Sequence, residues 1–102
     1  MARAKIYHFT ELEQQSAVVA KAFAHPARVR IMAALKEQGL VPYSTLTRIV
    51  PLAGGTLNQH LEMLSRAGLI ATVELADGRA GYGLQKEAQL AAYEMMVELL
   101  AA

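Results

Sequence analysis

The 102-residue chain contains no cysteine, no tryptophan and only three prolines. Without cysteine, the chain can form no disulfide bond, no thiolate metal site and no thiol-based redox sensor. No apolar run reaches the roughly 18 residues of a transmembrane helix. No signal peptide is visible, because Arg3 and Lys5 precede mixed residues rather than an apolar stretch. We therefore expect a cytoplasmic protein without a membrane partner.

The chain also lacks an excess of charge of either sign. Ten Lys and Arg against nine Asp and Glu give a formal net charge of +1, which does not by itself indicate a nucleic-acid partner. Hydrophobic residues nevertheless make up 54% of the chain, although a domain of this size buries only a modest fraction of its surface. This excess predicts a second buried surface, most simply the interface of a homodimer.

Turn and cap residues divide the chain into an arm and one domain. Residues 1–9 are expected to form an N-terminal arm, and residues 10–102 a single domain. Thr10 and Glu13 have the spacing of a capping box, in which each side chain bonds the other's backbone N–H. They predict that a first helix spans 10–24.

Two further helices are predicted from prolines, a glycine and a serine. Pro26 fits the first turn of a second helix, which ends at Gly39. The stretch "LVPYS", at 40–44, is a connector or a very short strand. Ser44 is expected to cap a short third helix over 45–50, which Pro51 ends.

A fourth helix, a hairpin and a last helix complete the predicted order. The fourth helix closes a helix-turn-helix over 44–67. An Asp77–Gly78 turn between β-rich segments predicts a hairpin wing over 70–84, and a long helix follows over 86–101. The fold class is therefore mainly α with a small β-hairpin wing, a winged helix-turn-helix dimerised through its first and last helices.

The fourth predicted helix has an apolar and a polar face. At about 100° per residue, three leucines share the core face: Leu57, Leu61 and Leu64. Thr56, Asn58 and Gln59 face outward in the first turn. Amides and hydroxyls suit base edges, since Asn or Gln can form two hydrogen bonds with adenine. We expect these three side chains to contact DNA.

Gly54 and Gly55 precede these residues and belong to the same candidate site. They let the backbone come close to a phosphate at a helix N-terminus, which has free N–H groups. The alternative is a simple turn followed by a solvated polar face. His60 completes the candidate contacts of this helix, although its place at the edge of the leucine face also suits a half-buried histidine bonded to the backbone.

Two arginines outside the fourth helix are further candidates for DNA contact. Arg79, beside Gly78 in the hairpin turn, suits the minor groove or a phosphate. Arg48 suits a phosphate, as does Arg66, while ordinary solvation is the alternative for each. Arg28 is expected to have a structural role at the helix junction.

The histidines and acids support neither a metal site nor an active site. His8 and His25 bracket a helix of about 15 residues, which separates them by on the order of 20 Å. His25 before Pro26 suits the end of a helix. There is no cysteine nucleophile and no serine-histidine-acid arrangement. We expect no metal, no cofactor and no enzymatic activity.

Apolar residues cover well over half of the last helix, beside a narrow acidic stripe of Glu87, Glu94 and Glu98. One small domain cannot cover so broad a face, which indicates a partner subunit. The alternative is a helix buried in its own core. The predicted interface residues of the first and last helices are Leu12, Leu90, Tyr93, Met96, Val97 and Leu100.

Three stretches give the sequence a family resemblance. They are "KAFAHPARVRIMAAL" at 21–35, "TLNQHLEMLSRAGLI" at 56–70 and "GRAGYGL" at 78–84. In this order and spacing the chain resembles the ArsR/SmtB-like family of bacterial winged helix-turn-helix transcriptional regulators over most of 17–100. The resemblance implies a homodimer joined by the first and last helices, with the fourth helix in the DNA major groove. Members are commonly repressors released by an effector.

The chain departs from the family at both of its usual metal sites. The third-helix site falls on "YSTLTRIV", which has no cysteine, and the last helix has no histidine. The resemblance therefore supports DNA binding but leaves the effector unknown. The predicted function is a sequence-specific, double-stranded DNA-binding transcriptional regulator, a homodimeric repressor. The alternative is a winged-helix module that binds another protein, which the weak net charge and an exposed Glu62 support.

Overall fold

The first helix begins where the sequence predicts. In the computed structural model, which describes residues 8–101, Thr10 is the N-cap of α2 (Glu11–Ala22). The Glu13 N–H donates to Thr10 Oγ1 at 3.1 Å, and the Thr10 N–H donates to Glu13 Oε1 at 2.8 Å. Both halves of the capping box are therefore present. Residues 1–7 of the predicted arm lie outside the described residues.

Both ends of the second predicted helix are also confirmed. Pro26 is the first residue of α3 (Pro26–Gln38), and His25 is its N-cap. His25 Nδ1 accepts a hydrogen bond from the Ala27 N–H at 2.9 Å. The helix ends at Gly39, whose φ of +84° lies in the left-handed region that favours glycine.

The short third helix begins earlier than predicted, and Ser44 does not cap it. Instead, α4 (Tyr43–Ile49) has Pro42 as its N-cap, and no side chain among the described residues caps this end. The reason lies in β1 (Val41–Pro42), which pairs with another strand. This pairing holds Pro42 in the extended conformation of an N-cap, so the helix starts at the next residue.

The wing consists of the predicted hairpin and the short strand β1. The hairpin strands are β2 (Ile70–Glu74) and β3 (Ala80–Leu84), and the antiparallel sheet has the order β1-β3-β2. Tyr82, in the middle of β3, pairs with Thr72 on one side and with Val41 on the other. The connector before α4 is thus the third strand, and it ties the wing to the helix-turn-helix.

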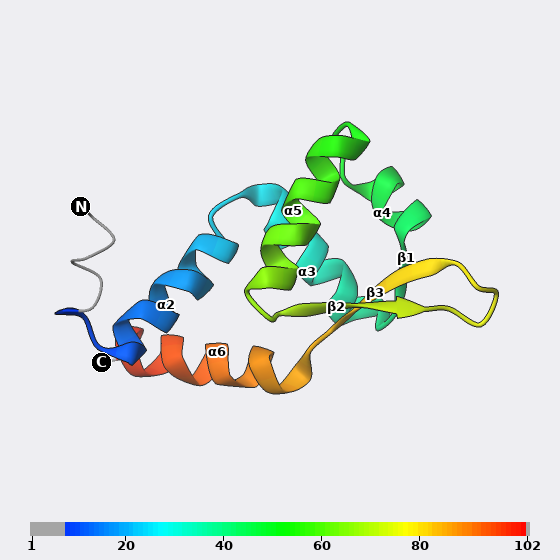
Figure 1. Cartoon of the computed structure of the whole chain (residues 1–102). Coiled ribbons are helices and arrows are strands. Elements are labelled where there is room, and N and C mark those ends of the chain that lie inside the picture. The colour runs from blue at the N-terminus through cyan, green and yellow to red at the C-terminus, as the bar shows by residue number, and fades with distance from the viewer. Residues whose placement is uncertain (1–7, 102) are drawn as a thin grey trace.

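The remaining helices are α5 (Gly54–Arg66) and α6 (Lys86–Leu100). Figure 1 shows α3 and α5 in the middle of the molecule, with the wing extending away from them beyond α4. On the other side, α2 and α6 lie beside one another and are in contact. No helix within residues 8–101 is both long and apolar enough to cross a lipid bilayer.

The core lies under the helix-turn-helix rather than under α2 and α6. The largest fully buried side chains come from α3, β1, α4, α5 and the segments beside them. They are Ile31, Leu35, Val41, Leu46, Val50, Leu57, Leu64 and Leu69. In contrast, α2 buries only Val19 and Ala22, and α6 buries only Ala92. The apolar faces of these two helices are therefore largely uncovered.

Candidate nucleic-acid interface

The recognition-type helix α5 has the two faces that its periodicity predicts. Leu57 and Leu64 are fully buried and Leu61 is 3% exposed, and each side chain contributes roughly 1.5–3 kcal/mol by its burial. Thr56, Asn58 and Gln59 are all exposed. The core face thus sets the rotation of α5 and directs the polar first turn to the surface.

The N-terminus of α5 is open. Its N-cap is Ala53, and no side chain within residues 8–101 caps this end. The first N–H groups of a helix have no partner inside the helix, so those of Gly54, Gly55 and Thr56 can bind an external acceptor. A Cβ added at Gly55 would meet nothing within 4 Å. This end of α5 therefore has the unpaired donors and the open space that a phosphate oxygen needs.

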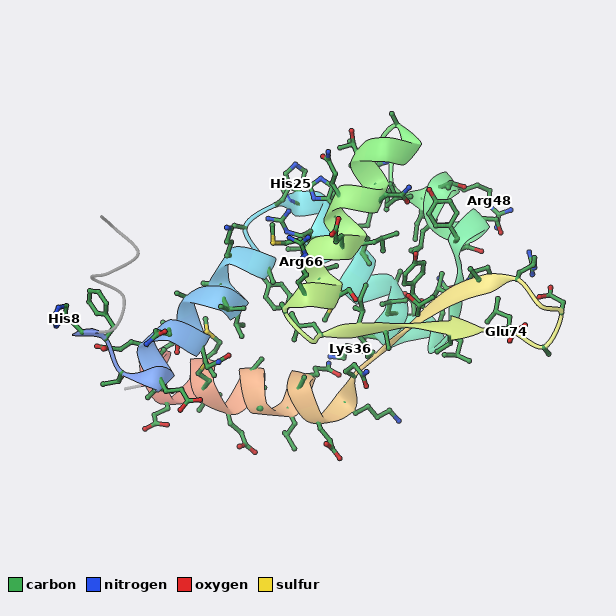
Figure 2. The ribbon with its side chains drawn as sticks, in the orientation of Figure 1. His8, His25, Lys36, Arg48, Arg66 and Glu74 are labelled. Atoms are coloured by element: carbon green, nitrogen blue, oxygen red, sulfur yellow. The ribbon has the colours of Figure 1, made fainter. Side chains whose placement is uncertain are left out.

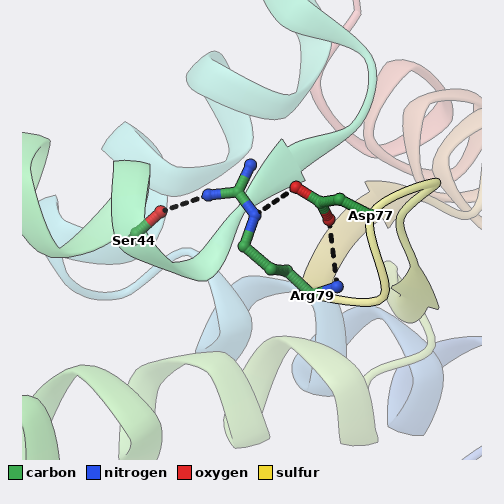
Figure 3. A network of polar contacts seen from close by, with 3 residues as sticks. All are labelled: Ser44, Asp77 and Arg79. Carbon is green, nitrogen blue, oxygen red and sulfur yellow. Dashed lines mark hydrogen bonds and ion pairs between the residues drawn. The ribbon is translucent and has the colours of Figure 1, made fainter.

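Arg79 lies in the turn of the wing and is held by two other residues (Figure 3). Its Nε pairs with Asp77 Oδ2 at 2.5 Å, and its backbone N–H donates to Asp77 Oδ1 at 3.0 Å. Its Nη1 donates to Ser44 Oγ, in the first turn of α4, at 3.4 Å. The Arg79 backbone N–H, and then its side chain, lower the pKa of Asp77. Asp77 therefore stays ionised and offsets the charge of Arg79.

The sequence pattern indicates Arg79 as a contact but neither of the two residues that hold it. The signal for Asp77 was present, since an aspartate two residues before a turn arginine can accept its backbone N–H. No local signal existed for Ser44, which is 35 residues away from Arg79 along the chain.

The other candidate arginines also lie on the surface. Figure 2 shows Arg48 on α4 and Arg66 on α5. Arg48 Nη2 donates to Thr45 Oγ1 at 3.3 Å. Arg66 Nη2 pairs with Glu62 Oε1 at 2.6 Å, one helical turn earlier, so Glu62 offsets its charge. Arg48 is thus the less compensated of the two cations.

His60 lies inside the protein and not on the predicted DNA-facing surface. Its side chain is 8% exposed, and its Nδ1 lies 2.8 Å from Arg28 Nη1. The partner of His60 is thus a side chain rather than the expected backbone group. The structural role predicted for Arg28 is confirmed, because its Nε also donates to Ala22 O at 2.8 Å. His60 is therefore not part of the exposed surface that α5 offers to DNA.

The histidines do not gather with acidic residues. The rings of His25 and His60 have centroids 4.3 Å apart, but within residues 8–101 no three His, Asp or Glu side chains form a group that could hold a metal ion.

Comparison with known proteins places this geometry in a family. Residues 23–73 match the family model described as a helix-turn-helix domain. The chain belongs to this helix-turn-helix family. No curated protein matches it.

Solved structures agree with this family over the whole winged domain. HlyU from Vibrio cholerae N16961 is 25% identical, with a TM-score of 0.68 over 92% of this chain and 100% of its own. An ArsR family transcriptional regulator, RHA00566, is 24% identical, with a TM-score of 0.70 over 83% of this chain and 91% of its own. The transcriptional repressor BigR from Xylella fastidiosa is 24% identical, with a TM-score of 0.65 over 100% of this chain and 99% of its own. The predicted ArsR/SmtB-like fold is thereby confirmed.

This helix-turn-helix protein is accordingly a DNA-binding transcriptional regulator and not an enzyme. Its recognition helix, α5, follows α4 in the order that the fold requires.

The helix-turn-helix protein has a second, apolar surface on α2 and α6. The predicted interface residues on α6 are largely exposed, with Tyr93 at 67% and Leu100 at 75%. On α2, Leu12 is 42% exposed. An open groove of about 380 Å³ lies between α2, α3 and α6, and Tyr93 and Met96 are among its lining residues. This surface is distinct from the one that carries the first turn of α5.

Proposed function

We propose that this regulator is a homodimer that binds a specific site in double-stranded DNA and represses transcription until an effector, unknown at present, releases it. The observation that carries the proposal is the exposed first turn of α5. It presents three uncharged hydrogen-bonding side chains, Thr56, Asn58 and Gln59, beside an uncapped helix N-terminus. Such side chains on the recognition helix of a winged helix-turn-helix suit the base edges of the major groove.

Each part of this surface has a different role in the proposal. Asn58 and Gln59 read base edges, because their amides can donate and accept at one base. The open backbone at Gly54 and Gly55 binds a phosphate, since unpaired N–H groups and the helix dipole favour an anion. These contacts place α5 in the groove and give the complex its preference for a sequence.

The flanking cations bind the sugar-phosphate backbone without reading sequence. Arg79 is more than half exposed in its side chain, so it can exchange part of its contact with Asp77 for a phosphate. Arg48 is exposed on α4, the other helix of the motif. Contacts of this kind orient the protein on the duplex.

The apolar faces of α2 and α6 support the homodimer. One domain leaves Leu12, Leu90, Val97 and Leu100 more than 40% exposed, and an apolar surface of this kind marks an interaction site. A two-fold axis beside these helices brings the same apolar surface of both subunits together. It also requires two DNA half-sites about 34–36 Å apart, one helical turn centre to centre.

Repression and location follow from the mode of binding. A dimer that covers a duplex site excludes other proteins from it, and BigR, which shares the fold, carries the name of a transcriptional repressor. HlyU and BigR come from bacteria, in which an operator lies in the cytoplasm, and the same location is proposed for this regulator. No cofactor takes part in the proposed contacts.

The proposal is tested by selecting binding sites from random duplex DNA and titrating variants on the selected site and on a scrambled duplex. Asn58→Ala and Gln59→Ala should each weaken binding to the selected site by about 1–3 kcal/mol and relax the preference at one base pair. Gln38→Ala removes a similar amide at the exposed end of α3 and should bind as the wild type does. Wild-type protein without any site preference would contradict the proposal.

A protein-binding winged helix is the second candidate. It is favoured by the Glu62–Arg66 ion pair on the exposed side of α5, because a carboxylate there repels phosphates. If selection recovers no DNA site while the chain remains folded and dimeric, this second function becomes the better one.

A further inference from the structure

Arg28 connects three helices through one guanidinium group. It lies in the first turn of α3 and donates from Nε to Ala22 O at 2.8 Å and from Nη2 to Lys21 O at 3.0 Å. Both acceptors are carbonyls at the C-terminal end of α2. The third contact joins Arg28 Nη1 to His60 Nδ1, on α5, at 2.8 Å. The end of a proposed dimerisation helix is thus bonded to the recognition helix through one side chain.

The contact defines the protonation state of His60. Arginine can only donate hydrogen bonds, so His60 Nδ1 must be unprotonated and accept. A neutral ring then carries its proton on Nε2. His60 is also the one buried polar or charged side chain within residues 8–101, and it has little solvent to replace a lost partner.

The surroundings of His60 disfavour its charged form. The ionisable groups that face it are His25, at the junction of α2 and α3, and Arg28 on α3. Burial first, and then the charges of His25 and Arg28, lower the pKa of His60 from the ordinary 6.5. Protonation would remove the acceptor on Nδ1 and place a second positive charge against Arg28.

The position of His60 in α5 relates this contact to DNA reading. His60 directly follows Gln59 and lies two residues after Asn58. Successive residues of a helix point about 100° apart, so the direction of His60 determines where those two amides point. A rotation of α5 that broke the contact with Arg28 would turn Asn58 and Gln59 away from their bases.

We propose that Arg28 and His60 are positioning residues, which couple the end of α2 to the rotation of α5 and make site-specific DNA binding depend on a neutral His60. The inference rests on the proposed function, since it concerns the specificity of the DNA complex. It adds a device that links the dimerisation helix to the reading surface.

The sign of the pH dependence follows from the lowered pKa. Because the folded state binds a proton on His60 more weakly than the unfolded chain does, the neutral ring stabilises the fold above pH 6.5. That stabilisation is lost as the pH falls from 6.5 through the folded-state pKa. Selectivity for the preferred site should fall over the same interval.

The experiment measures the affinity for the selected site relative to a scrambled duplex at about pH 7.5 and about pH 5.5. In the wild type this ratio should fall at the lower pH by less than about tenfold, because a tenfold loss needs the ordinary pKa of 6.5 and the pKa of His60 lies below that value. His60→Asn keeps an acceptor near the position of Nδ1 but cannot be protonated. Its ratio should stay constant with pH.

Two further variants separate positioning from mere packing. His60→Leu removes the acceptor and should lower the ratio at both pH values. His8→Asn removes an exposed histidine outside the cluster and should follow the wild type. The inference is overturned if His60→Leu keeps the wild-type ratio, or if His60→Asn loses selectivity at low pH as the wild type does. A wild type without site preference at pH 7.5 would instead refute the proposed function.

A measurement on the unaltered protein tests the geometry even where a variant does not fold. Long-range ¹H–¹⁵N NMR of the imidazole rings should show His60 with its proton on Nε2 and a pKa below 6.5. A proton on Nδ1 would overturn the contact with Arg28, and with it the inference.

Discussion

Replacing Asp77 by asparagine should tighten binding to every DNA duplex, whereas replacing Arg79 by alanine should weaken it. In the wing, Asp77 offsets the charge of Arg79 through the contact of 2.5 Å between Oδ2 and Nε. Asparagine removes the negative charge but keeps an oxygen for the Arg79 N–H, so the turn is preserved. Asp77→Asn therefore frees the Arg79 guanidinium from its ion pair, whereas Arg79→Ala removes that positive charge.

The magnitude follows from the number of wings. Each neutralised phosphate contributes about 0.9 to the slope of log affinity against log salt concentration, and a dimer has two wings, so Arg79→Ala should flatten the slope by about 1.8. Between about 50 and about 200 mM salt, the advantage of the wild type over Arg79→Ala should then shrink by about twelvefold. Asp77→Asn should steepen the slope by less than this, because it only strengthens the contact of the same Arg79 with one phosphate per wing.

The assay is a fluorescence anisotropy titration on the selected and the scrambled duplex at several salt concentrations. Both side chains of the pair are more than half exposed, so breaking it should leave the thermal stability nearly unchanged. Glu74→Gln is the matched control, because it removes a wing carboxylate that forms no ion pair among the described residues. If Asp77→Asn and Glu74→Gln have the same slope, Asp77 does not restrain Arg79. If Arg79→Ala affects the selected site alone, Arg79 reads bases and the phosphate assignment is refuted.

Two further predictions concern the dimer and the start of α5. Val97→Glu and Leu100→Glu should each yield monomers in analytical sedimentation, because a buried charge would lack a partner. The control Glu98→Gln, on the same helix, should stay dimeric. A wild type that sediments as an 11.1 kDa monomer at micromolar concentration refutes the interface. Gly55→Ala should raise the free energy of unfolding by about 0.5–1 kcal/mol, since the added Cβ meets nothing within 4 Å, yet weaken binding to all duplexes; unchanged affinity would show that no phosphate contacts this turn.

Local sequence signals were sufficient for the boundaries of several elements. The Thr10–Glu13 capping box, Pro26 and Gly39 mark helix ends because each acts on backbone groups within a few residues of itself. The Asp77–Gly78 turn works in the same way, since Gly78 adopts a φ of +83°. Periodicity also separated the two faces of α5, because burial on one side repeats with each helical turn.

Tertiary contacts decided the features that local rules missed. Strand β1 has two residues, too few to show any alternation, and only its pairing with β3 makes it a strand. That pairing moved the start of α4 from the expected position after Ser44 to Tyr43. A short segment of this kind takes its conformation from the partner that it meets, and not from its own propensity.

His60 shows the same division at the candidate site. Its position in the sequence placed it on the boundary between the two faces of α5, where helical period alone allows either burial or exposure. The ring is buried where it contacts Arg28, which lies 32 residues earlier in the chain. In the same way, Ser44 contacts Arg79 across 35 residues. The sequence by itself determined which helix presents Asn58 and Gln59, because amphipathic period and turn chemistry are local. Which polar side chains meet inside the protein depended on the packing of distant segments, so only the tertiary structure could decide it.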